Sequence, residues 1–137
     1  MNLSKEVLIE TLNIISSKQS ISLTINGTAS YAPKILKKDF LINWEKSAFE
    51  IHNKIRALSY KGAYALYENK RIKFFDTFIY QGSKNNPRGG FYYEDQIIYI
   101  QTGENYLGVV KLQVEGARII SANDFYNTLK KGPCHFE

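Results

Sequence analysis

Residues 62–81 read GAYALYENKRIKFFDTFIYQ, and this stretch decides the fold. Apolar and polar side chains alternate along 63–68 and again along 71–81, which is typical of β-strands. The pair Asn69-Lys70 stands between the two runs. We therefore predict an antiparallel β-hairpin with its turn at this pair.

The second strand of the predicted hairpin has two unlike faces. Successive side chains of a strand point to opposite sides, so Arg71 and Lys73 share one face while Ile72 and Phe74 share the other. The apolar face contributes to a core. The other face presents positive charge to the surroundings.

Short runs of strand-forming residues also lie outside the hairpin and are separated by turn residues. Together with the hairpin they make about six strands, which indicates a small antiparallel barrel or sandwich. A polar loop at 82–90 divides the hairpin from the later strands. The additional strands are predicted at 41–44, 91–93, 96–102 and 106–113.

Three helices accompany the predicted strands. Residues 3–18 carry apolar side chains at spacings of three and four, and 46–58 repeat this pattern. A third helix begins after the capping sequence Ser121-Ala-Asn-Asp124 and runs to Lys131. No partner helix follows the first one, so we expect its apolar stripe to pack outside this chain or on the domain downstream.

The composition places the chain among globular proteins. Its 137 residues suit one domain with a short appendage, and no apolar run approaches the length of a membrane span. The single cysteine, Cys134, excludes an internal disulfide framework and favours a reducing compartment, so we expect a cytoplasmic protein. Two histidines and one cysteine cannot supply a Cys/His zinc site at standard spacing.

No constellation of catalytic residues is recognisable. Glu94-Asp95 is interpreted as a hairpin turn, and the sequence places no carboxylate or nucleophile near His52. Cys134 and His135 lie in the last four residues, where chains commonly fray, whereas a catalytic pair needs rigid placement. We therefore predict no catalytic residue, no metal ligand and no cofactor held by this chain.

The net charge of +5 comes from the middle of the chain. Residues 31–90 hold twelve basic and five acidic side chains, whereas residues 91–137 hold four basic and six acidic ones. A basic centre favours a positive face directed at a polyanion; the alternative is that the lysines only keep the domain soluble. We predict contacts with nucleic-acid phosphates from Lys34, Lys37, Lys38, Arg56, Lys61, Arg71, Lys73 and Arg88.

The tyrosines have two interpretations. Their rings offer flat faces on which bases stack, but they also serve as packing residues between strands. Packing is expected for most of those between Tyr60 and Tyr106.

Several motifs, in their order along the chain, resemble methionyl-tRNA formyltransferases. Ala29-Ser-Tyr-Ala-Pro-Lys-Ile35 is similar to the segment that joins the two domains of that family. The likeness extends over about residues 29–131. Further similar segments are the short strand Ile42-Asn-Trp44, the helix from Ala48 to Ala57, the turn Gly62-Ala-Tyr64, the basic strand Arg71-Ile-Lys-Phe74, and the closing strand and helix that contain Leu112–Gly116 and Ser121–Phe125.

The resemblance implies both a fold and a partner. It implies a mainly β domain, an OB-like β-barrel of about six strands with two flanking helices plus an N-terminal helix, which holds initiator methionyl-tRNA. In this family a separate N-terminal domain carries the catalytic Asn, His and Asp and transfers formyl from 10-formyltetrahydrofolate. Those motifs are not found here, so we expect a monomeric fragment or stand-alone relative whose partner is that N-terminal formyltransferase domain. The predicted division is the end of the N-terminal domain at 1–28, a basic linker at 29–41 and the barrel domain at 42–137.

Two turns depart from the family pattern. Ser59-Tyr-Lys-Gly62 stands where the family usually has a turn like Pro-Trp-Pro-Gly, and Pro87-Arg-Gly-Gly90 replaces its usual proline-glycine. Folate-dependent sugar formyltransferases have a similar C-terminal lobe, so a structural or oligomerising role without RNA is the alternative. A third interpretation is a purely structural barrel whose lysines only interact with water.

Overall fold

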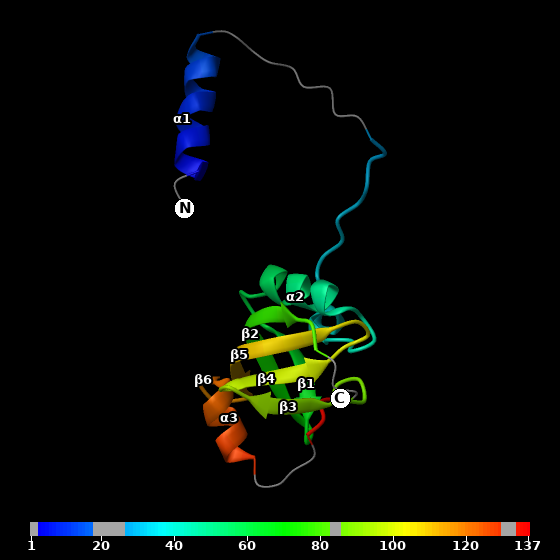
Figure 1. Ribbon diagram of the computed structural model, residues 1–137. Coiled ribbons are helices and arrows are strands. Elements are labelled where there is room, and N and C mark those ends of the chain that lie inside the picture. The colour runs from blue at the N-terminus through cyan, green and yellow to red at the C-terminus, as the bar shows by residue number, and fades with distance from the viewer. Residues whose placement is uncertain (1–2, 18–26, 83–85, 130–133) are drawn as a thin grey trace. The chain divides into compact units, whose positions relative to one another are not determined.

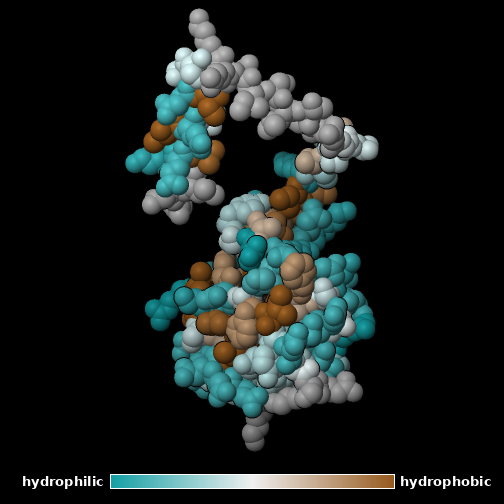
Figure 2. Space-filling model, turned by 45° about the horizontal axis from the view of Figure 1, so that its top comes forward, coloured by the Kyte–Doolittle hydropathy of each residue, from teal (hydrophilic) through white to brown (hydrophobic). Residues whose placement is uncertain are grey.

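The computed structural model describes residues 3–17, 27–82, 86–129 and 134–137, and the chain divides into two units, 1–33 and 34–137 (Figure 1). The first unit contains α1 (Leu3–Ser16), which confirms the predicted helix. Apolar side chains lie on the surface of α1 (Figure 2), among them Leu12, which is 55% exposed. Residues 18–26, in the segment predicted to be the end of an N-terminal domain (1–28), lie outside the described residues.

The second unit is built on one antiparallel sheet of six strands, in the order β1-β2-β5-β4-β3 with β6 also on β5 (Figure 1). The predicted hairpin is confirmed, since Tyr67 pairs with Lys70. Its turn lies one residue earlier than predicted: Lys70 already belongs to the second strand, and the turn residues Glu68 and Asn69 have φ values of 48° and 63°. The strands are β1 (Ala63–Tyr67), β2 (Lys70–Tyr80), β3 (Phe91–Glu94), β4 (Ile97–Gln101), β5 (Tyr106–Val114) and β6 (Ile119–Ser121).

The sheet is not closed into a barrel, so the prediction of a barrel was wrong in this respect. Strands β1 and β3 are its two edges, and they do not pair with each other. The strand predicted at 41–44 is only a single bridge between Leu41 and Tyr64, because the chain turns at 44–46 and leaves too few residues for a ladder. The sixth strand is instead β6, which pairs with the second half of β5.

The last residues of the chain lie between the two sheet edges. Leu66 of β1 and Glu137 exchange two backbone hydrogen bonds of 3.1 and 2.8 Å. On the other edge, the amide of Phe91 donates to the carbonyl of Cys134 at 2.8 Å. Phe136, between them, is fully buried in the core. The expectation that these residues fray was therefore wrong.

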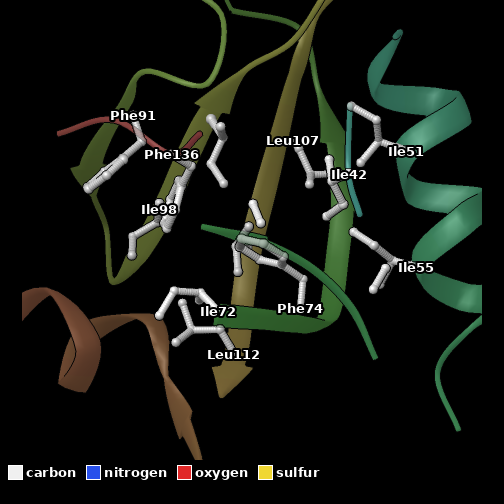
Figure 3. Close-up of a cluster of buried hydrophobic side chains, with 14 of the residues drawn as sticks. Ile42, Ile51, Ile55, Ile72, Phe74, Phe91, Ile98, Leu107, Leu112 and Phe136 are labelled. Atoms are coloured by element: carbon white, nitrogen blue, oxygen red, sulfur yellow. The ribbon is translucent and has the colours of Figure 1, made fainter. Parts of the chain in front are cut away.

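Helix α2 (Ala48–Ala57) covers one side of the sheet and packs on β2. It begins at a capping box, in which Ser47 Oγ accepts from the Glu50 amide while the Glu50 carboxylate accepts from the Ser47 amide. Ile51 and Ile55 point from this helix into the core, toward side chains of the sheet (Figure 3). Burial of this apolar face fixes α2 against the hairpin.

Two shorter helices complete the second unit. The described residues form three α-helices and six strands, so the fold is mixed α/β and not mainly β as predicted. Helix α3 (Ala122–Thr128) begins at Ser121, whose Oγ accepts from the Asp124 amide at 3.0 Å, as the capping sequence predicts. A 3-10 turn, η1 (Lys37–Phe40), lies within the segment predicted to be a basic linker (29–41). Within the described ranges, no helix combines the length and apolarity that crossing a bilayer requires.

Candidate nucleic-acid interface

An open groove of about 530 Å³ lies on the second unit, and four of the eight predicted RNA-binding residues line it. We call it the basic groove. Its cations come from η1, from the turn after α2 and from β2, so three separate parts of the chain contribute positive charge. The groove is lined by Lys37, Lys61, Arg71 and Lys73, together with Ile35, Phe40, Tyr60, Gly62, Tyr64, Phe75 and Gln113.

The floor of the basic groove is the outward face of three adjacent strands. Lys73 of β2 pairs with Tyr64 of β1 on one side and with Gln113 of β5 on the other, so the three side chains form a row across the sheet. The neighbours of Lys73 on its own strand, Ile72 and Phe74, are fully buried. This confirms the prediction of one apolar and one basic face for this strand.

Aromatic rings hold two of the cations in place. The guanidinium of Arg71 lies 5.3 Å from the centroid of the Tyr64 ring. The ammonium of Lys61 lies 5.5 Å from the Tyr60 centroid and 6.0 Å from that of Phe40. These are cation–π distances, and such contacts restrain long side chains that otherwise sample many rotamers.

Gly62 brings the end of α2 close to the sheet. Its φ of 80° is left-handed, and an added Cβ would lie 3.0 Å from Phe75 Cζ and 3.1 Å from Lys73 Cβ. A residue without a side chain is therefore needed where the chain turns into β1. The close approach places Lys61 beside the cations of β2.

The charge of the basic groove is not neutralised by ion pairs in the described part of the chain. The ion pairs found there, Lys46 with Glu50 and Arg88 with Glu45, lie outside the groove. Glu115 lines an adjoining depression together with Arg71 and Lys73, and its carboxylate accepts from the Arg71 backbone amide at 3.4 Å. The four groove cations are therefore available to bind an external anion.

The other four predicted residues do not line the basic groove. Lys34 is exposed near the start of the second unit. Lys38 and Arg88 line a different depression, and Arg88 is paired there with Glu45. Arg56 is exposed on the last turn of α2.

The aromatic side chains of the basic groove were not among the predicted site residues. Tyr60 is 63% exposed and lies directly before Lys61, and this tyrosine-lysine pair was a usable signal in the sequence. Most other tyrosines have the packing role that was expected. Tyr99 is buried in a group of rings, with centroids 4.7 Å from Tyr80 and 5.1 Å from Tyr92.

The candidate catalytic side chains are not assembled into a reactive pair. His52 Nδ1 is 2.9 Å from Thr77 Oγ1. Burial, followed by the nearby charge of Arg56, lowers the pKa of His52. The described residues contain no group of three or more His, Cys, Asp and Glu side chains placed to hold a metal ion.

Comparison with known proteins gives the family. Residues 34–130 match the model of the formyl transferase C-terminal domain. The methionyl-tRNA formyltransferase of Coprothermobacter proteolyticus is 33% identical over 105 residues, covering 77% of this chain and 34% of that protein. The methionyl-tRNA formyltransferase of Caldicellulosiruptor saccharolyticus is 34% identical over 140 residues, covering 95% of this chain and 43% of that protein. The chain thus spans well under half the length of these relatives.

A solved structure shares the fold. HypX from Aquifex aeolicus, in complex with tetrahydrofolic acid, superposes with a TM-score of 0.66 at 16% identity, covering 93% of this chain and 23% of that one. At this identity the likeness concerns the fold alone. Because the family model matches most of its length, the chain belongs to the formyl transferase C-terminal domain family and is related to methionyl-tRNA formyltransferases.

Proposed function

We propose that this domain binds tRNA, in particular initiator methionyl-tRNA, through the basic groove. Formyl transfer from 10-formyltetrahydrofolate would be the work of a separate formyltransferase domain, such as the remaining length of the relatives provides. This chain would contribute affinity and orientation rather than chemistry, in the cytoplasm where tRNA is charged.

The observation that carries the proposal is the grouping of four cations without carboxylate partners in the described residues. Lys37, Lys61, Arg71 and Lys73 come from distant points in the sequence and line one groove. A-form RNA presents phosphates and 2′-hydroxyls to a protein, because its major groove is too narrow for side chains to enter. Cationic side chains on an open surface suit that target.

Salt dependence tests the proposal directly. Binding of fluorescently labelled bulk tRNA is followed by anisotropy at several NaCl concentrations. If all four groove cations contact phosphates, the affinity falls by roughly 50- to 150-fold between about 50 and 200 mM salt. An affinity that does not change with salt, or no binding at all, would contradict the proposal.

Two matched double variants test whether tRNA binds at the basic groove. Lys61→Ala/Lys73→Ala removes two charges from the basic groove, whereas Lys111→Ala/Arg118→Ala removes two from a depression at β5 and β6. The groove variant is expected to lower the salt slope by about 1.4 to 1.8, and the control is expected to change it little. Equal decreases in the salt slope of the two double variants would mean that tRNA binding depends on net charge and not on the basic groove.

The alternative is a C-terminal lobe of a folate-dependent sugar formyltransferase that binds no RNA. The same experiment separates the two functions, since that lobe would leave tRNA unbound at low salt. Gel filtration then tests the oligomerising role that this alternative implies.

A further inference from the structure

We infer that the basic groove receives an unpaired nucleotide, whose base stacks on the ring of Tyr60 while its phosphates lie beside Lys61 and Lys73. This inference rests on the proposed RNA-binding function and adds the structural state of the RNA that is recognised: a single-stranded segment rather than a duplex.

The position of Tyr60 is fixed although its ring is exposed. The residue follows α2 in the turn before Gly62 and lines the groove. Phe40, which is buried, meets the Tyr60 ring edge-on, with centroids 6.1 Å apart and planes at 67°. This geometry is favourable for aromatic pairs, and it leaves Tyr60 63% exposed.

The lining of the groove combines the two kinds of surface that a nucleotide presents. Phe40, Tyr60, Tyr64 and Phe75 supply aromatic surface, and four cations stand among them. Aromatic side chains beside a positively charged track are the usual means of binding single-stranded nucleic acid, because a ring accepts the base and the charges hold the backbone. A groove for duplex phosphates needs the charges and the rings that restrain them, but it does not need a ring as exposed as that of Tyr60.

Other exposed aromatic side chains of the second unit lack this setting. Phe49 on α2 is also 63% exposed, but it does not line the groove. Tyr80 and Tyr126 do not line the groove either, and each lies closer to a second ring than Tyr60 does, with centroids 4.7 Å from Tyr99 and 4.2 Å from Tyr93 respectively. Tyr60 therefore combines exposure, a fixed orientation and neighbouring cations.

The chemistry requires that the base be unpaired. In a duplex both faces of a base are covered by stacking, so a tyrosine ring reaches a base face only in loops, bulges and ends. Every base has such a face, and the site should accept different base sequences with similar affinity.

Two RNA probes and three single variants test the inference. The probes are a single strand of roughly ten nucleotides that carries a 2-aminopurine, and a blunt duplex of the same length. The variants are Tyr60→Ala, Tyr60→Phe and, as a matched control, Phe49→Ala, which removes an equally exposed ring outside the groove. Thermal melts verify that each variant is folded.

Stacking predicts a large loss for one variant on one probe. Tyr60→Ala weakens single-strand binding by about 5- to 150-fold and leaves the salt slope unchanged. Because the substitution also removes the ring beside Lys61, duplex binding falls by no more than about two- to fivefold. Tyr60→Phe and Phe49→Ala bind like the wild type. The 2-aminopurine fluorescence is quenched when the wild type binds, which reports base stacking without any substitution.

The failures of the two proposals are distinguishable. If Tyr60→Ala binds the single strand normally while Lys61→Ala/Lys73→Ala does not, stacking is wrong and the RNA-binding function stands. Equal weakening of both probes by Tyr60→Ala would also overturn stacking. If the wild type binds neither RNA, both proposals fail.

Discussion

The guanidinium of Arg71 lies over the ring of Tyr64, 5.3 Å from its centroid, although the residue paired with Arg71 across the hairpin is Leu66. The side chain therefore leans along β1 instead of extending into water. A ring on one strand thus orients a cation on the next, within the basic groove.

Replacing Tyr64 tests this orientation. Tyr64→Leu keeps an apolar side chain on β1 but removes the π-face, so tRNA affinity should fall about two- to fivefold while the salt slope stays unchanged. Anisotropy measures both quantities. Tyr126→Leu removes a half-exposed ring that is stacked on Tyr93 outside the groove, and it should bind normally. Equal losses of tRNA affinity in the two variants would show that the Tyr64 ring does not orient Arg71 for binding.

Gly62 should be required for both stability and binding. Gly62→Ala introduces a left-handed alanine, which costs about 1–2 kcal/mol, and also pushes on Phe75 and Lys73. Gly116 has a similar φ of 77° but open space around its Cα, so Gly116→Ala isolates the backbone cost. Urea unfolding should show a larger loss of stability for Gly62→Ala than for Gly116→Ala. Only Gly62→Ala should also weaken tRNA binding. Equal losses would mean that the close approach is unimportant.

The end of the chain should be essential for the fold. Phe136 is fully buried against aromatic rings that include Trp44, Phe74 and Phe91. Phe136→Ala should lower the free energy of unfolding by about 3–5 kcal/mol, as for other buried phenylalanines. Phe49→Ala, at an exposed position, should change it by less than about 0.5 kcal/mol. A small effect at Phe136 would contradict its place in the core.

His52 should make stability depend on pH. Its pKa is lowered in the folded state, first by burial and then by Arg56, so the unfolded chain takes up a proton more readily. The free energy of unfolding is therefore highest above the ordinary pKa of about 6.5, and it falls as the pH drops through and below that value. Urea unfolding across this window should show less pH dependence in His52→Gln.

The local parts of the fold were predictable from the sequence. The hairpin follows from the alternation on either side of Asn69-Lys70, and the start of α3 follows from Ser121, because caps and period-two patterns act between neighbouring residues. The pairing of the last residues with both sheet edges was not predictable. Phe136 is buried by residues far away in the sequence, and no local pattern reports such contacts.

Only four of the eight predicted binding residues line the basic groove, because long-range contacts and local conformation decide where a side chain points. Lys37 and Lys38 are neighbours in the sequence, yet they line different depressions. A 3-10 turn has three residues per turn, so adjacent side chains point about 120° apart. Because this segment was interpreted only as a basic linker, the two lysines were treated alike. The pairing of Arg88 with Glu45 is likewise a long-range contact that composition cannot reveal.

The central claim is that RNA binds in the basic groove. Mapping the contact surface by NMR tests this claim most directly. Backbone amide shifts of the isotope-labelled chain are recorded while unlabelled tRNA is added at low salt. The account predicts that the largest changes cluster at Tyr60–Tyr64, Arg71–Phe75 and Gln113, the segments that line the groove. Changes centred instead on the depression of Lys111 and Arg118, or spread evenly over the surface, would contradict it.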